Sequence, residues 1–157
     1  MVSDPLGILR LNDDKVSMDI AEISILIQPY AAALAAKRRT PEDLEELRQV
    51  VEEYQREWSR YREGRISYPE MRRIDSRFHA IIIRCCRNVV MDRFNAAMEE
   101  FSDYYRENRS DLILQDNYTM HPLILDAIER GDAEEASALM LKHLHRMDEL
   151  LHPKKKA

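Results

Sequence analysis

The chain has 157 residues, a length that suits one domain and can bury a hydrophobic core without disulfides. Its formal net charge is -5, from 24 Lys and Arg against 29 Asp and Glu, so the broad basic face of a DNA-binding domain is not expected. Only three glycines are present, which argues against the many tight turns of a β-sandwich or barrel and favours long helices.

The first predicted helix spans about residues 19–39. It follows an irregular segment, residues 1–18, in which turn-forming residues are frequent. The helix contains the alanine-rich run 31–36, which is a strong helix former. Pro29 falls inside this helix and is expected to kink it.

Cap signals mark the next two helix starts. Thr40 precedes a proline and two acids, an order that predicts a helix over residues 41–64. Ser67 and Glu70 form a capping-box pattern, also with a proline in the first turn, and this pattern predicts a helix over residues 68–86.

The second half of the chain continues the helical pattern. We expect a helix over residues 88–108, a polar link over 109–117 and a shorter helix around 122–130 that ends at Gly131. Asp132 then caps the last helix, whose apolar side extends to the end of the domain. The fold class predicted is all-α, an antiparallel bundle of six to seven helices.

Two adjacent thiols, Cys85 and Cys86, are the only cysteines. Neighbouring residues on a helix point in different directions, so we expect no disulfide between them and a reducing compartment. The sequence shows no signal segment and no apolar run that we expect to span a membrane. These features predict a cytoplasmic protein with no membrane partner.

Three histidines and one aspartate lie where helical bundles build metal sites. Asp75 and His79 are four residues apart and therefore share a helix face. His143 lies beside the apolar side of the last helix, and His121 begins the preceding one. One carboxylate and three imidazoles suit Zn, Ni or Mn. The spacing alone favours simpler interpretations over a metal site. Asp75 and His79 would then form a surface ion pair, and His143 would be a structural histidine of the core.

Five segments, taken in order, resemble the ligand-binding (FCD) domain of FadR-like regulators of the GntR family. The resemblance covers about residues 19–150 and implies a fold like the C-terminal domain of FadR. The segments are LIQPYAAALAA at 26–36, TPEDL at 40–44, DSRFH at 75–79, HPLILDAIERGD at 121–132 and LMLKHL at 139–144.

The resemblance implies a metal site and an effector. In metal-binding members of the family an aspartate and three histidines bind one divalent cation, and these positions are occupied here by Asp75, His79, His121 and His143. A small organic acid is then expected to bind the metal through oxygen.

The chain departs from the family pattern at three places. Ser24 and Gln28 stand where the family often has arginine and glutamate, and we take these two residues as candidate effector contacts. In the family His121 is usually preceded by glutamate, whereas Met120 stands here. Pro122 after His121 also disfavours helical geometry at the histidine and predicts that it lies at a helix N-cap.

The family resemblance also implies a division of the chain into segments. Residues 1–18 are expected to be the linker after a missing N-terminal winged helix-turn-helix domain, residues 19–152 the effector- and metal-binding domain, and 153–157 a basic tail. The function expected is that of a sensor rather than an enzyme. It would form a homodimer and contact DNA only through the missing domain.

Two other functions remain open from the sequence. A metal-dependent hydrolytic enzyme could use the same four residues, although no motif supplies a general base or a nucleophile elbow. A metal-free helical interaction module could instead use aromatic residues to line a pocket or a partner surface: Trp58, Tyr54, Tyr61, Tyr104 and Tyr105.

Overall fold

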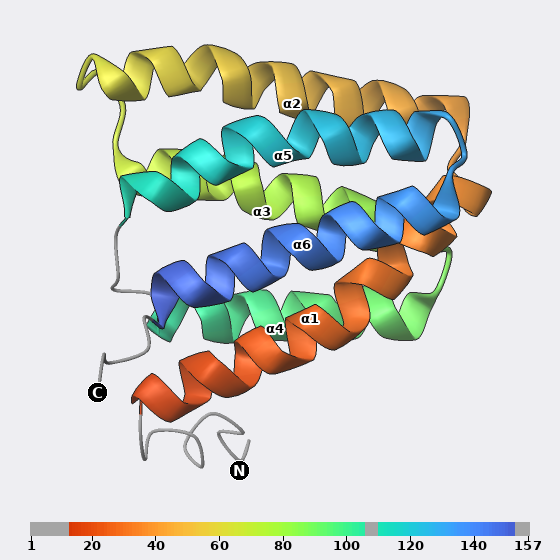
Figure 1. Cartoon of the computed structure of the whole chain (residues 1–157), viewed down its shortest axis with the longest axis horizontal. Helices are drawn as coiled ribbons and strands as arrows, with labels where there is room; N and C mark the ends of the chain where they lie inside the picture. The colour runs from red at the N-terminus through yellow and green to blue at the C-terminus, as the bar shows by residue number, and fades with distance from the viewer. Residues whose placement is uncertain (1–12, 106–109, 153–157) are drawn as a thin grey trace, which may run out of the picture.

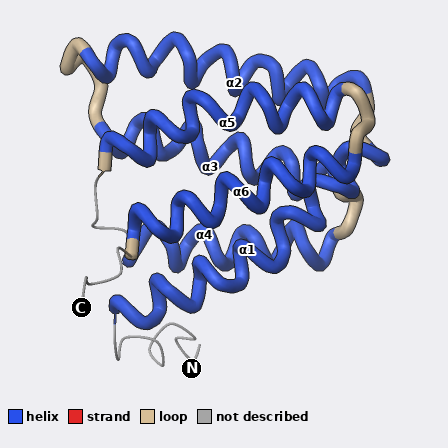
Figure 2. Tube along the Cα trace, in the orientation of Figure 1, coloured by secondary structure: helices blue, strands red, loops and turns tan. Residues whose placement is uncertain are grey.

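The structure, a computed structural model, describes residues 13–105 and 110–152 (Figure 1). These residues form six α-helices and no strand, which confirms the predicted all-α class. Figure 2 shows the helices and the loops that join them along the chain. The helices are α1 (Asp13–Arg38), α2 (Pro41–Arg62), α3 (Tyr68–Cys85), α4 (Val89–Tyr105), α5 (Asp111–Glu129) and α6 (Ala133–Leu151).

Successive helices run in opposite directions along the long axis of the molecule (Figure 1). Helix α1 lies along α6, α2 packs on α3 and α5, and α5 packs on α6. Short links between consecutive helices favour antiparallel neighbours. The arrangement is therefore the predicted antiparallel bundle, and its centre is bounded by α1, α3, α5 and α6.

The caps that the sequence predicts are formed. The Thr40 hydroxyl accepts a hydrogen bond from the backbone N–H of Asp43, and the Asp43 carboxylate accepts the N–H of Thr40 at 2.8 Å. Glu70 accepts the N–H of Ser67 at 2.7 Å. These bonds satisfy N–H groups that have no partner within the helix, and they fix the starts of α2 and α3 at the predicted residues.

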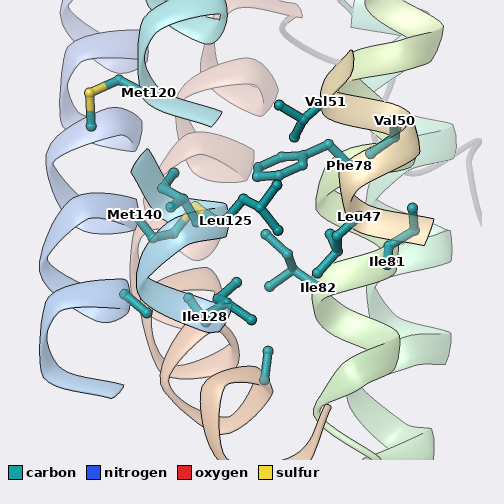
Figure 3. Close-up of a cluster of buried hydrophobic side chains, with 14 of the residues drawn as sticks. Leu47, Val50, Val51, Phe78, Ile81, Ile82, Met120, Leu125, Ile128 and Met140 are labelled. Carbon is teal, nitrogen blue, oxygen red and sulfur yellow. The ribbon is translucent and has the colours of Figure 1, made fainter. Parts of the chain in front are cut away.

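The hydrophobic core is built from the inward faces of α1, α2, α3, α5 and α6, and Figure 3 shows part of it. Leu47 comes from α2, Phe78 and Ile82 from α3, Ile128 from α5 and Met140 from α6, and all five are buried. Burying such a side chain contributes roughly 1.5–3 kcal/mol. The packing of these side chains holds the central helices in fixed relative positions.

The predicted polar link over residues 109–117 is wrong where the structure describes it. Helix α5 begins at Asp111 and continues through Pro122 to Glu129. Ile113, Leu114 and Asn117 are buried on the same face as the following turns, so packing of this face outweighs the cost of one interior proline.

The helix boundaries differ from the predicted ones at the chain ends. Helix α1 begins at Asp13 rather than near residue 19, and Pro29 lies within it and is buried. Residues 1–12, 106–109 and 153–157 lie outside the described residues. Three predicted features therefore lie wholly or mostly outside the described residues: the linker, the end of the fourth helix near residue 108 and the basic tail.

One described helix is long and apolar enough to cross a membrane by length and composition alone, contrary to our expectation from the sequence. This segment is Met18–Arg38. Length and composition are weak evidence, because a core helix of a soluble protein meets the same criterion. Here Ala32, Ala35 and Ala36 are fully buried in the main core, and the helix lies along α6.

The core packing can be tested with Leu47→Ala. Because Leu47 is fully buried, the substitution leaves a cavity and should lower the free energy of unfolding by about 2–5 kcal/mol in urea denaturation. The matched control Leu112→Ala removes an exposed leucine from α5 and should change it by about 0.5 kcal/mol or less. Equal effects of the two substitutions would contradict the described core.

Candidate metal centre

Four buried side chains from three helices meet at the centre of the bundle. Asp75 and His79 come from α3, His121 from α5 and His143 from α6. Each offers one ligand atom, and these four atoms all lie within 4.8 Å of one another. The structure thus brings together the four residues that were selected from the sequence.

The position of His121 differs from the prediction. It lies well inside α5 rather than at an N-cap, although Pro122 follows it. Its ring stacks on Phe78, with ring centroids 4.0 Å apart, and meets Tyr54 edge-on at 5.4 Å. Aromatic packing from α2 and α3 therefore fixes the direction of this imidazole.

Asp75 is a buried, ionised carboxylate whose two oxygens have different surroundings. Oδ2 accepts a hydrogen bond from Arg72 Nη1 at 2.5 Å, one turn earlier on the same helix. Oδ1 has no hydrogen-bond partner and lies 3.4 Å from Nε2 of both His79 and His121. Burial tends to raise the pKa of Asp75, but the Arg72 charge and the two histidines outweigh it and hold the pKa well below its usual range.

Hydrogen bonds at Nδ1 orient two of the three imidazoles, those of His79 and His143. His79 Nδ1 lies 2.7 Å from Gln28 Oε1 on α1, and His143 Nδ1 lies 2.8 Å from Asp116 Oδ2 on α5. Both partner atoms are oxygens that accept hydrogen bonds, so Nδ1 is the donor in each pair. In a neutral imidazole with this tautomer the lone pair is on Nε2. Partners of this kind are the usual companions of metal-binding histidines.

Burial controls the charge of His121. Its side chain is almost completely enclosed, and neither ring nitrogen has a hydrogen-bond partner. Burial lowers the pKa of His121 to about 3, outweighing the opposite effect of Asp75. The imidazole is therefore neutral at neutral pH and keeps a lone pair for binding.

The unpaired atoms of this cluster fit a divalent cation. Asp75 Oδ1, His121 Nε2 and His143 Nε2 are buried without hydrogen-bond partners, which is costly unless something binds them. Donors roughly 2.1 Å from one ion lie about 3–4 Å apart, and the 3.4 Å separations fall in this range. Three imidazole nitrogens and one carboxylate oxygen are a donor set that suits transition-metal ions.

A small pocket opens beside the cluster. Its lining includes Asp75, His79 and His143 as well as the predicted effector contacts Ser24 and Gln28. Its cavity volume is about 40 Å³, which is room for roughly three water molecules. Ser24 faces the pocket from α1, whereas the Gln28 carbonyl is already engaged by His79.

Three polar residues at this site were not found from the sequence. Arg72 pairs with Asp75, Asp116 pairs with His143, and Glu99 on α4 lines the pocket. Arg72 is one helical turn from Asp75, so its spacing was a usable signal. Asp116 and Glu99 reach the site from other helices, and no local pattern marks them.

Comparison with known proteins gives one family and similar proteins. A profile described as the FCD domain matches residues 19–146. The HTH-type transcriptional regulator LutR of Bacillus subtilis (strain 168) is 25% identical over 157 residues, covering 96% of this chain and 68% of that protein. A solved structure described as Streptococcus agalactiae GntR matches with a TM-score of 0.77 and 24% identity. This match covers 92% of the present chain and 64% of the chain in the solved structure. The structural similarity confirms the predicted fold.

The neutral state of His121 predicts a pH dependence for protein treated with a chelator. The pKa of His121 is about 3 in the folded state against a usual value of 6.5. Below about pH 6.5 the unfolded chain therefore takes up a proton that the folded chain does not, and stability falls as the pH falls. Between about pH 7 and pH 5 the free energy of unfolding should decrease by ~2 kcal/mol through this residue.

Urea denaturation at the two pH values measures this contribution. In His121→Leu the decrease should be smaller than in the parent by about that amount, whereas the exposed His145→Leu should retain most of the parent's decrease. An equal decrease in the parent and in His121→Leu would contradict the burial argument.

Proposed function

The chain belongs to the FCD domain family, and from this premise we propose that it is the metal-containing, effector-sensing domain of a GntR-type transcription regulator. The single observation that supports metal binding and effector binding is the convergence of four buried donor groups beside a small pocket. The similar curated protein is named as a transcriptional regulator, which supports a sensor rather than an enzyme.

Asp75 Oδ1 and the Nε2 atoms of His79, His121 and His143 would hold one divalent cation, for which we propose Zn, Ni or Mn. When bound, the cation supplies positive charge to which an oxygen of a small organic acid can bind. Gln28 and Asp116 orient two of the imidazoles, and Ser24 offers a hydroxyl to the acid from the α1 side of the pocket.

The position of the pocket suggests how binding would be transmitted. Its lining comes from α1, α3, α4 and α6, so an acid in the pocket would contact four helices, of which α1 packs on each of the other three. A change in their packing would alter the position of a DNA-reading winged helix-turn-helix domain on the N-terminal side, in the bacterial cytoplasm. Couplings of this kind are typically about 1–3 kcal/mol.

The proposed metal site predicts the metal content of protein purified without a histidine tag. We expect about one divalent ion per chain in the parent and a large loss in Asp75→Asn and His143→Ala. Asp75→Asn replaces the anionic carboxylate by a neutral and weaker oxygen donor, and His143→Ala removes one imidazole donor. Elemental analysis by mass spectrometry measures the ratio. The matched control His145→Ala changes an exposed histidine of the same helix and should keep the ion.

Other results with the same proteins would decide between the open functions. A parent chain that binds no ion after dialysis against Zn, Ni and Mn would contradict the metal site and favour a metal-free interaction module. Turnover of carboxylate esters or amides by the metal-loaded protein, lost in Asp75→Asn, would favour the hydrolytic enzyme over the sensor.

We further propose a homodimer, as palindromic operators require two DNA-reading heads. Helices α1 and α4 contact each other and carry exposed apolar side chains, Leu26 and Tyr30 on α1 and Val90 on α4. Exposed apolar surface of this kind is typical of protein interfaces.

The dimer can be tested by sedimentation equilibrium of Leu26→Glu and Val90→Glu. We expect the parent to be a dimer and both variants to shift towards monomer, because each places a charge in the interface. The control Leu123→Glu alters an exposed leucine on α5 and should remain a dimer. A monomeric parent, or dimeric variants, would contradict this proposal.

A further inference from the structure

The pocket beside the metal cluster contains an unpaired acid that the proposed site does not use. Glu99 on α4 lines this pocket, and its Oε2 atom is buried without a hydrogen-bond partner. A buried carboxylate oxygen without a partner is costly, so a group that donates a hydrogen bond to it would be favoured there.

The other charged groups of the pocket have the same sign or are already paired. Asp148 also lines the pocket, and its Oδ1 atom lies 2.9 Å from His152 Nδ1. Asp75 lines it too, with Oδ2 bonded to Arg72. Among the described lining residues none is lysine or arginine. The described wall of the pocket therefore offers no cationic side chain to a second acidic group of a ligand.

The lining of the pocket therefore includes two kinds of unpaired group. His143 Nε2 and Asp75 Oδ1 are buried, without hydrogen-bond partners and part of the metal cluster. Glu99 Oε2 is a buried oxygen without a partner that belongs to another helix, α4. The remaining wall includes Ala21, Leu144 and Met147, which suit a short aliphatic group.

We propose that the effector is a small amino acid, whose carboxylate is held at the metal cluster and whose ammonium group donates a hydrogen bond to Glu99. This inference rests on the proposed function and narrows its effector from organic acids in general. An ammonium matches the Glu99 carboxylate in charge as well as in hydrogen bonding, and charge-assisted bonds are the stronger ones.

The same chemistry disfavours three related classes of acid. A dicarboxylic acid would place its second carboxylate near Glu99 and Asp148, where like charges repel. A simple carboxylic acid would leave Glu99 Oε2 unpaired. A hydroxy acid would donate a hydrogen bond but leave the charge of Glu99 unbalanced.

Binding measurements on the metal-loaded protein test this selectivity. Calorimetric titration would compare glycine, alanine and serine with the hydroxy acid, the simple carboxylic acid and the dicarboxylic acid of the same carbon number. We expect the amino acid with the lowest Kd to bind at least about tenfold more tightly than the hydroxy, simple and dicarboxylic acids of the same carbon number. In Glu99→Gln this preference should be lost while the metal content stays at the parent level.

The control is Glu52→Gln, which removes an exposed acid on α2 and should keep both the metal and the preference. Three results would overturn the inference: tighter binding of a hydroxy, simple or dicarboxylic acid, no binding of any amino acid, or an unchanged preference in Glu99→Gln. Loss of the metal in Glu99→Gln would also overturn it, because Glu99 would then be a metal ligand. A parent chain without metal would instead contradict the proposed function itself.

Discussion

The central constraint on this bundle is an ionised carboxylate enclosed in its interior. Asp75 is almost fully buried, and Arg72 compensates only one of its two oxygens. The other oxygen lies 3.4 Å from Nε2 of both His79 and His121, and the His121 atom is itself buried without a hydrogen-bond partner. A fold does not leave several such atoms unpaired at one point without a cost of a few kcal/mol, and a bound cation removes that cost for all of them at once.

This constraint links the candidate metal centre to the packing of the helices. Each donor comes from a helix that is also held by the hydrophobic core, and the imidazoles of His79 and His143 are oriented by side chains of α1 and α5. The pocket lies where α1, α3, α4 and α6 meet at this cluster. A ligand that binds there contacts elements whose relative positions are set by the same residues, which is the physical basis for the proposed sensing function.

Much of this fold could be predicted from the sequence, because the information was local. The capping residues Thr40 and Ser67 and the spacing of Asp75 and His79 lie within single helices. The start of α5 was predicted wrongly, because polar residues and Pro122 locally favour a link while the buried face of the helix stabilises it through packing. The roles of Asp116 and Glu99 depend on contacts between helices, and such contacts leave no pattern in one sequence.

The most direct test of the metal centre is X-ray anomalous scattering from crystals of the metal-loaded protein, recorded on both sides of the absorption edge of the bound ion. We expect one strong peak per chain, at roughly 2.0–2.2 Å from Asp75 Oδ1 and from the Nε2 atoms of His79, His121 and His143. A peak at other residues, or no peak in protein exposed to the ion, would contradict the claim that a divalent cation resolves the buried polar cluster.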